Sequence, residues 1–600
     1  MRPTPLKNLL FSQPKRIYFF LTLAILLIAL IVHYGTISDN ARALKAAREA
    51  YRSEPNSPKA QLNLRNLERK VKVQESFFRA PYDGRADQLP ANSFGQAQSF
   101  LEELNGEPLL AGNWSGRFRP YVFRKGHYLS LFQERPLKNF ENFDFYSPTP
   151  ISNHEILFAG EELGNKKFDL FLYDTQKAKI VPLTNTPGSD NGDFCLSPKK
   201  DLIAFRQDQS ERIAKLFDQT LHYFDGSEMP EFQRCLWVNQ NKFLGLAGRE
   251  KPFAIYSCET NNEKALCTQS SLGHSLQDFQ DFYKTDDGEI GFIALKDDSE
   301  FRQAYAINDG FKSSKLSLKN PKAKGDVLEI TDGVSRLGFE SRYWSTLSNE
   351  KTSIIFKIKK MGSEFFAIAA DGNSSKSLAV LDRERWKIQA HPNFSAPSTI
   401  SEPKEIWLQA ANAARTQAFY FGAEHPKKVV VWFHGGPKEN VSPRFNPYFQ
   451  ELNRRGFGVL AVNYPGSTGR GREFQESFKN SGAQSQSMKS VFKFLSDNSA
   501  DEIIAWSIST GAEMQKFILK NGFRVSAVVD QAGQNSTELR ELALDRHIPY
   551  FSIRGTNDYF PDDTGFFDVL YEGGHDISFF PNFRILFEKF DAFLARLENH

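Results

Sequence analysis

The sequence is poor in the residues that mark metal and redox sites, and it carries no excess of charge of either sign. Its 600 residues include four cysteines and 11 histidines, and the formal net charge is +3. No Cys-x-x-Cys pair occurs and the histidines do not cluster near the cysteines, which argues against a zinc site. A charge so near zero provides no basic surface for nucleic acid. We therefore expect no metal, no cofactor and no nucleic-acid partner.

Long apolar runs are scarce as well, but one near the amino terminus approaches the length of a membrane span. Residues 17–32 read IYFFLTLAILLIALIV and are followed by His33 and Tyr34. A membrane-spanning helix needs about 20 residues, with a lower limit near 17. We expect residues 17–34 to form a single transmembrane signal-anchor helix, because the run has no polar face at any period.

The charges around this segment predict its orientation. The preceding flank carries basic residues and no acid, so the positive-inside rule places residues 1–16 in the cytoplasm and the rest of the chain outside. In a two-membrane bacterium the soluble part would lie in the periplasm. A cleaved signal peptide is the alternative, although the Ala41-Arg42-Ala43 site lies far beyond the apolar run.

The next two segments differ in composition. Residues 35–105 are expected to form a helical stalk or linker, because helix formers with apolar residues three and four apart run from Asp39 to about Phe78. A helical hairpin that packs against the later domains is the alternative. From 106 to 400 short β-rich segments alternate with turns. Five apolar strands are centred at Phe158, Phe205, Leu246, Phe292 and Phe356, at spacings of 47, 41, 46 and 64 residues.

A spacing of 40–50 residues with several strands in each unit is typical of a β-propeller blade. Residues 169–205 also resemble a blade of the TolB-type propellers. We expect six or seven blades of this TolB- or WD40-like kind between 106 and 400; an irregular β-sandwich is the alternative. Cys195 and Cys235 fall at matching points of two repeats, and Cys258 and Cys267 flank a turn, so both pairs are candidate disulfides in an exported chain. Buried free thiols are the other interpretation.

Beyond residue 401 predicted strands alternate with predicted helices up to residue 600. This alternation predicts a mostly parallel sheet flanked by helices. The strands are expected at 427–433, 456–464, 502–507, 525–533, 549–555 and 566–574, and the helices at 446–455, 491–498, 511–522 and 584–598.

A candidate nucleophile lies between one of these strands and the helix that follows. Ser509 stands in SISTGA, where a sharp strand-to-helix turn needs small neighbours. The usual pattern is GxSxG, and here Ser507 replaces the first glycine. Asp558 and His575 follow two later strands, so the chain order is the Ser, Asp, His of α/β-hydrolases. His575 would take the proton of Ser509, and Asp558 would orient the imidazole.

The backbone needed to stabilise an oxyanion is also predictable. His434 to Pro437 read HGGP and end a strand, so Gly435 and Gly436 can present an N–H group. The second donor would be the N–H of Thr510, the residue after the nucleophile.

These motifs together resemble the prolyl oligopeptidase family of serine peptidases. The matching segments are HGGP, NYPGSTGRGREF at 463–474, SISTGA, RGTND at 554–558 and GGHD at 573–576. The resemblance implies a β-propeller followed by an α/β-hydrolase domain, and hydrolysis of short peptides by Ser509, Asp558 and His575. Tyr464 and Arg470 in the second segment are candidate substrate-binding residues, although a solvated loop is the favoured interpretation of Arg470.

Several departures from the family leave alternatives open. Thr510 replaces an aromatic residue, RGTND replaces a common HGTxD, and the chain is short both between Asp530 and Pro549 and between Asp558 and His575. A catalytically weak or inactive scaffold that binds a partner is therefore one alternative, and an esterase acting on small acyl substrates is another. Asp562 and Asp563 could replace Asp558 as the acid. Homo-oligomerisation is left open.

Overall fold

The computed structural model describes residues 96–597 apart from gaps, of which the longest are 316–327 and 390–400. The predicted transmembrane segment at 17–34 and nearly all of the predicted stalk lie outside the described residues. In the part of the chain that is described, no helix is long and apolar enough to cross a membrane. Residues 86–600 form one compact unit.

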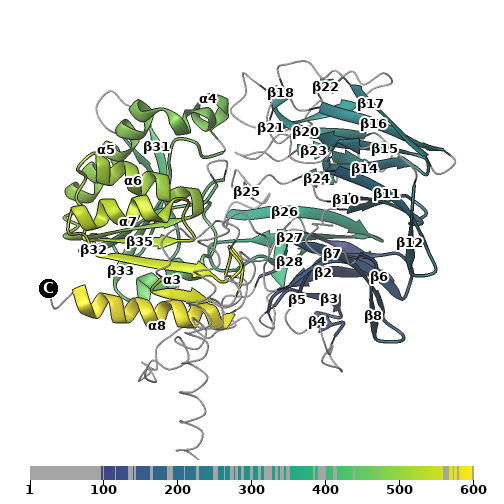
Figure 1. Cartoon of the computed structure of the whole chain (residues 1–600), viewed down its shortest axis with the longest axis horizontal. Coiled ribbons are helices and arrows are strands. Elements are labelled where there is room, and N and C mark those ends of the chain that lie inside the picture. The colour runs from purple at the N-terminus through teal and green to yellow at the C-terminus, as the bar shows by residue number, and fades with distance from the viewer. Residues whose placement is uncertain are drawn as a thin grey trace, which may run out of the picture. The chain divides into compact units, whose positions relative to one another are not determined.

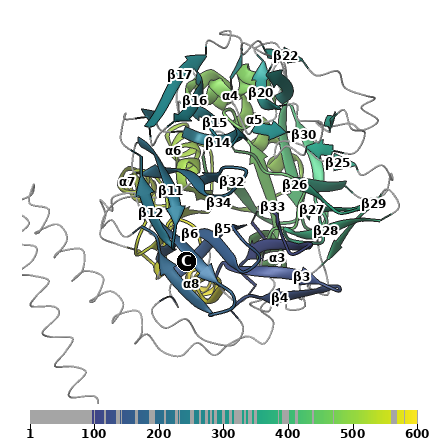
Figure 2. The ribbon, with the colours of Figure 1, turned by 90° about the vertical axis from the view of Figure 1, so that its right-hand side faces the viewer.

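The first part of this unit is a series of antiparallel sheets, each built from one continuous stretch of chain (Figure 1). The described residues form seven of them, and the sheets follow one another around a ring in the view of Figure 2. Their strands are β1–β4 within residues 102–130, β5–β8 within 143–182, β9–β13 within 194–230, β14–β17 within 232–270, β18–β22 within 276–315, β23 and β24 within 328–337, and β25–β29 within 344–389.

The five apolar strands expected from the sequence are the second strands of their sheets. They are β6 (Glu155–Glu162), β10 (Leu202–Gln207), β15 (Lys242–Ala247), β20 (Ile290–Lys296) and β26 (Thr352–Met361). In β6 six consecutive residues are buried. A strand covered on both faces needs apolar residues at every position, which explains why these strands were the recognisable ones. The sheet of β1–β4 and the short β23–β24 pair were not predicted.

The first and last sheets pack against each other and so close the ring. One apolar cluster contains Tyr121 and Tyr128 of the first sheet together with Phe366 and Leu378 of the last. The buried Tyr128 hydroxyl accepts a hydrogen bond from Leu378 N and donates one to Gln389 O, at 3.0 and 2.6 Å. Closure therefore rests on side-chain packing and a few hydrogen bonds.

The four cysteines form two disulfides, one between two sheets and one within a single sheet. Cys195 in β9 (Phe194–Leu196) is bonded to Cys235 in β14 (Phe232–Asn239), which joins the edge strands of two successive sheets. Cys258 and Cys267 lie opposite each other in β16 (Ala254–Asn261) and β17 (Lys264–Ser270), so their bond stays within one sheet. Only the first bond ties neighbouring sheets together.

The last part of the chain contains one eight-stranded sheet with the order β30-β31-β33-β32-β34-β35-β36-β37. The six strands from β33 to β37 in that order run parallel, while β30 and β31 form an antiparallel edge that the sequence did not predict. The strands are β30 (Lys404–Leu408), β31 (Thr416–Phe421), β32 (Lys428–Phe433), β33 (Phe457–Asn463), β34 (Glu502–Ile508), β35 (Ala527–Gln531), β36 (Tyr550–Gly555) and β37 (Val569–Tyr571).

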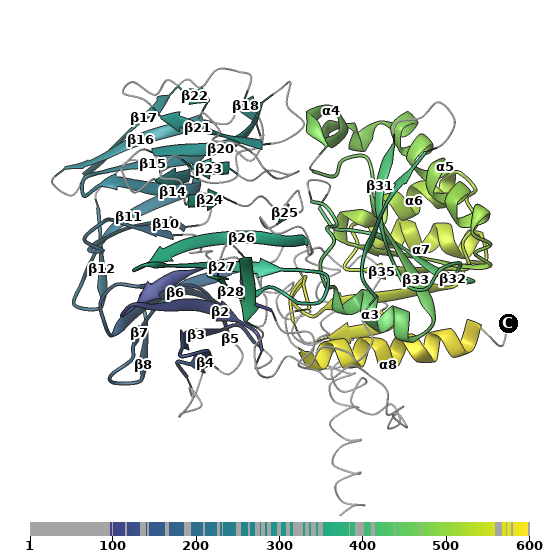
Figure 3. The same cartoon turned by 180° about the vertical axis from the view of Figure 1, so that it is seen from behind.

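Helices cover both faces of this sheet (Figure 3). On one face α5 (Ser481–Asp497), α6 (Ala512–Lys520) and α7 (Ser536–Asp545) contribute to one apolar cluster. On the other face α3 (Pro447–Arg454) and α8 (Phe580–Leu597) contribute to a second cluster. The short α4 (Gly471–Glu476) precedes α5.

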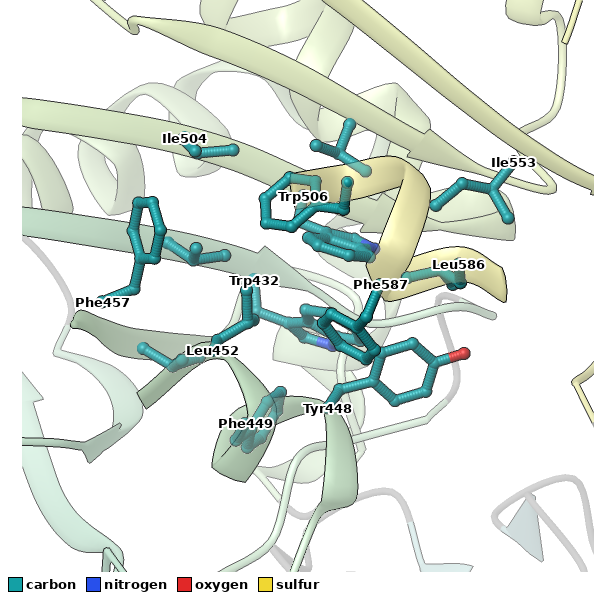
Figure 4. Packing of buried hydrophobic residues seen from close by; sticks show 14 of the residues in the cluster. Trp432, Tyr448, Phe449, Leu452, Phe457, Ile504, Trp506, Ile553, Leu586 and Phe587 are labelled. Carbon is teal, nitrogen blue, oxygen red and sulfur yellow. The ribbon is translucent and has the colours of Figure 1, made fainter. Parts of the chain in front are cut away.

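The second cluster is an aromatic layer beneath the central strands (Figure 4). Trp432 of β32 and Trp506 of β34 are direct neighbours in the parallel register, and their rings stack with centroids 5.4 Å apart. Tyr448 of α3 and Phe587 of α8 pack onto Trp506. Large fully buried rings give a rigid base to the strand ends that carry the site, because they leave little freedom for the strands to shift.

Candidate active site

Ser509 occupies a strained turn between β34 and α6. Its φ angle is 53°, in the left-handed region that costs a non-glycine residue about 1–2 kcal/mol. A short 3-10 turn, Ser509–Gly511, leads directly into α6. A strained residue at the carboxyl end of a central parallel strand is the arrangement expected of a nucleophile elbow.

Gly511 explains why this turn needs a glycine on its helical side. A Cβ at Gly511 would lie 2.6 Å from Phe433 O and 2.7 Å from His434 O. These carbonyls end β32, so the elbow is pressed against the neighbouring strand. A side chain at position 511 would force the two apart.

The departure at Ser507 is accommodated by a partner that the sequence did not reveal. The buried Ser507 hydroxyl donates to Gln515 Oε1 at 2.6 Å. The Gln515 amide in turn donates to Ala505 O and Val529 O, both at 2.8 Å. A buried hydroxyl without a partner would destabilise the turn, so Ser507 and Gln515 form a unit that fixes α6 against β34 and β35.

The HGGP turn lies directly beside the nucleophile. A Cβ on Gly435 would lie 3.3 Å from the Cβ of Ser509, and Gly436 has a φ of 48°. Thr510 follows Ser509 at the start of the helix, where N–H groups have no partner within the helix. The predicted oxyanion donors Gly435 and Thr510 thus both lie next to Ser509, with Gly436 following Gly435 in the chain.

His434 and Tyr464 pack against each other and support the HGGP turn. The two rings stack with centroids 4.4 Å apart, and the Tyr464 hydroxyl donates to His434 O at 2.7 Å. The His434 Nε2 lies 2.7 Å from Ser467 Oγ. Burial lowers the pKa of His434 to about 4. Tyr464, expected to bind substrate, is fully buried, and its described contacts support the turn instead.

Asp558 and His575 lie on the loops that follow β36 and β37. The His575 Nδ1 lies 2.9 Å from Asp558 Oδ1, and the two side chains are only 7% and 1% exposed. An imidazole held by a buried carboxylate through Nδ1 presents Nε2 as the base. Asp562 and Asp563, the alternative acids, fall outside the described residues.

Backbone contacts fix these two loops against each other. A Cβ on Gly555 would lie 2.0 Å from Gly574 O, so a glycine is required there. Asn557 N donates to Gly573 O at 2.8 Å. The Tyr571 hydroxyl donates to Gly574 O and His575 O, and burial raises the Tyr571 pKa well above its usual range, which keeps this donor protonated.

The structure places Ser509 and the Asp558–His575 pair at the carboxyl ends of strands in one parallel sheet, which is the same edge of the sheet. Among the described contacts no hydrogen bond joins Ser509 to His575. Such bonds are often long before substrate is bound. The described residues offer no group of three or more His, Cys, Asp or Glu suited to a metal ion.

Arg470 lies at another part of the sheet. Its guanidinium stacks over Trp407 of the edge strand β30 and over Phe474 of α4, at 5.1 and 4.3 Å from the ring centroids. Strand β30 is separated from the nucleophile strand β34 by β31, β33 and β32. These contacts make Arg470 part of a surface aromatic stack.

No protein-family model matches the chain. Among curated proteins, the dipeptidyl-peptidase 4 of Giardia intestinalis is 25% identical over 203 residues, which are 30% of this chain and 26% of that protein. The dipeptidyl aminopeptidase BIII of Pseudoxanthomonas mexicana is 44% identical over 52 residues, 9% of this chain and 8% of that protein. The match therefore spans about a quarter or less of the length of these relatives.

Solved structures match over much more of the chain. A puromycin hydrolase aligns with a TM-score of 0.61 at 14% identity, covering 86% of this chain and 96% of its own. An acylaminoacyl peptidase of Pyrococcus horikoshii aligns with a TM-score of 0.55 at 14% identity, covering 84% and 97%. The chain thus has the fold of these peptidases, which confirms its predicted resemblance to the prolyl oligopeptidase family.

Proposed function

We propose that this protein is a serine hydrolase that cleaves short peptides through an acyl-enzyme intermediate. Ser509 is the nucleophile, His575 the general base and Asp558 the group that orients the base. The observation that carries this proposal is the arrangement at one sheet edge: a strained serine, a glycine turn against it, and a buried histidine–aspartate pair on the adjacent loops.

The chemistry follows from these positions. As Ser509 Oγ attacks a carbonyl carbon, its proton passes to His575 Nε2, and the charge on the imidazolium is stabilised by Asp558. The N–H groups of Thr510 and of the Gly435–Gly436 turn stabilise the oxyanion. His575 then protonates the leaving amine. In the second half-reaction His575 takes a proton from water as the water attacks the acyl carbon, and it returns a proton to Ser509 Oγ as the acyl–oxygen bond breaks.

The substrate class rests on similarity. The structural neighbours are named for puromycin and acylaminoacyl substrates, and the sequence relatives for dipeptidyl cleavage. Three of these four names are peptidase names, which supports a peptide substrate here. The same triad also hydrolyses esters, so a non-peptide acyl substrate is the second candidate, and a partner-binding scaffold is the third.

A panel of short peptide amides and matched esters tests this proposal on the full chain, with loss of substrate followed by mass spectrometry. Ser509→Ala is expected to abolish turnover. Ser490→Ala is the matched control, because Ser490 is also buried and its hydroxyl donates to Gln486 O within α5. Turnover that survives Ser509→Ala would contradict the proposal. Ester turnover without peptide turnover would favour the esterase.

We further propose that residues 17–34 anchor the protein in a membrane with residues 35–600 outside the cytoplasm. The apolar run and its basic flank support this. Expression of the full chain and of a chain lacking residues 1–34 would test it by membrane fractionation and protease access. Equal recovery of both in the soluble fraction would contradict the anchor.

A further inference from the structure

Arg554 is a buried cation that the proposed reaction does not yet use. It is the fifth residue of β36, in the RGTND segment where the sequence departs from the pattern it resembles. Its side chain is 4% exposed. Burying a guanidinium is costly unless charge and hydrogen-bond partners compensate, so the partners of Arg554 define what it does.

The first set of partners immobilises the guanidinium. One terminal nitrogen donates to Gly533 O at 2.6 Å and to Ser536 Oγ at 3.0 Å. The guanidinium also lies over the ring of Phe567, 5.3 Å from its centroid. Hydrogen bonds at one end and a ring over its face leave the group little rotational freedom.

The second partner is the proposed catalytic acid. Arg554 Nε lies 3.9 Å from Asp558 Oδ2, while the other carboxylate oxygen, Oδ1, faces His575 Nδ1. The two oxygens of Asp558 therefore face a cation on one side and the base on the other. Because the Asp558 side chain is 1% exposed, this attraction is little screened by water.

The hydrogen bonds of Arg554 also lead to the nucleophile. Gly533 lies between β35 and α7, and Ser536 is the first residue of α7. The backbone nitrogen of Gln534, between them in the chain, lies 3.5 Å from Ser509 O. The charge of Arg554 also acts on Asp530, a buried carboxyl near the end of β35. Arg554 thus links the loop beside Ser509 to the loop that carries Asp558.

We propose that Arg554 is a positioning residue: it fixes the Asp558 carboxylate, and through it the His575 ring, in register with the Ser509 elbow. This role rests on the proposed function. It predicts that the arginine at this position is needed for the rate of the chemical step and not for binding of substrate.

Three variants of the full chain test this role. Arg554→Met keeps the apolar length and removes the charge, and we expect it to slow fluorophosphonate labelling of Ser509 by about 100-fold with little change in KM for any substrate found. Arg554→Lys is expected to recover part of that rate, because lysine keeps the positive charge but lacks the planar guanidinium with its several donors. Arg455→Met is the matched control. Arg455 follows the last residue of α3, is largely buried, and pairs with Asp591 of α8.

A spectroscopic readout separates positioning from general stability. The proton of His575 Nδ1, hydrogen-bonded to Asp558, is expected as a downfield resonance that is assigned by its loss in His575→Gln. Arg554→Met should shift or abolish this resonance in folded protein, whereas Arg455→Met should leave it in place. An unchanged resonance together with wild-type labelling in Arg554→Met would overturn the proposal.

Labelling and the resonance together distinguish failure of the proposed function from failure of the proposed role of Arg554. If the wild-type protein shows no labelling, the proposed function fails, and the resonance still tests whether Arg554 positions Asp558 and His575. If labelling falls in Arg554→Met and Arg455→Met alike, in proportion to the unfolded fraction, Arg554 is only structural and the inference is wrong.

Discussion

His575 Nδ1 and Asp558 Oδ1 lie 2.9 Å apart although the two residues are 17 positions apart in the chain. The contact is set by two short loops that close against each other through Gly555 and Gly573 at the ends of adjacent parallel strands. A pair so placed and so buried orients an imidazole for proton transfer at Nε2.

Asp558→Asn is expected to keep the fold and to lower the rate of acylation by about 10⁴-fold, because an amide favours the wrong imidazole tautomer. The rate of fluorophosphonate labelling measures this directly. Asp568→Asn is the control, since Asp568 is a partly buried carboxylate directly before β37 that accepts a hydrogen bond from Ser552 N. Equal rates for the two variants would assign the acid to another residue.

Gln515→Leu is expected to lower the free energy of unfolding by about 1–3 kcal/mol, because it leaves the Ser507 hydroxyl buried without its acceptor. Denaturant unfolding would measure the loss. Combining it with Ser507→Ala should recover part of the stability, since the orphaned hydroxyl is removed as well. Strictly additive losses in this double-mutant cycle would show that the two side chains do not act together.

Gly511→Ala is expected to prevent labelling of Ser509, because the new methyl group would lie 2.6 Å from Phe433 O and force the elbow away from β32. Gly522→Ala is the comparison: its φ is 76°, yet nothing lies within 4 Å of its Cβ. That substitution should cost only the strain of a left-handed alanine, about 1 kcal/mol. Comparable labelling in the two variants would contradict the close approach of the elbow to β32.

The stability of the hydrolase domain is expected to fall as the pH drops from about 6.5 to about 4. The pKa of His434 is lowered to about 4 from its ordinary 6.5 by burial, so the unfolded chain binds a proton in this window that the folded chain does not. The stability that depends on a neutral, buried His434 is therefore fully present above pH 6.5. Its loss is on the order of 3 kcal/mol across the window.

Thermal unfolding of the wild type and of His434→Gln over this pH range would measure that contribution. The variant is expected to be less stable at neutral pH and to show a weaker pH dependence between 4 and 6.5. An identical slope in the two proteins would show that His434 is not the group responsible.

The sequence carried enough information to predict the propeller-plus-hydrolase fold and the residues of the candidate site, because strong local patterns marked them. Strands such as β6 and β34 are apolar along most of their length, and Ser509 stands between such a strand and a helix. The edge strand β30 escaped notice because it is largely exposed and lacks a continuous apolar run.

Other features depend on contacts between distant residues and leave no local signal. Tyr464 was a candidate substrate-binding residue because it lies in the NYPGSTGRGREF segment, whereas in the fold its hydroxyl donates to His434 O, 30 residues away. The partnership of Ser507 with Gln515, and that of Arg554 with Ser536, likewise appear only once strand and helix are packed. The sequence signal that pointed to Arg554 was that RGTND has an arginine where the common pattern HGTxD has a histidine.

The most direct test of the account is labelling of the full chain with a fluorophosphonate probe, followed by peptide mass spectrometry to locate the adduct. A serine reacts readily only when a base and an oxyanion site activate it. We predict a single adduct on Ser509 that disappears in Ser509→Ala and in His575→Gln. Folded wild-type protein that takes up no probe, or that takes it up at another serine, would contradict the account.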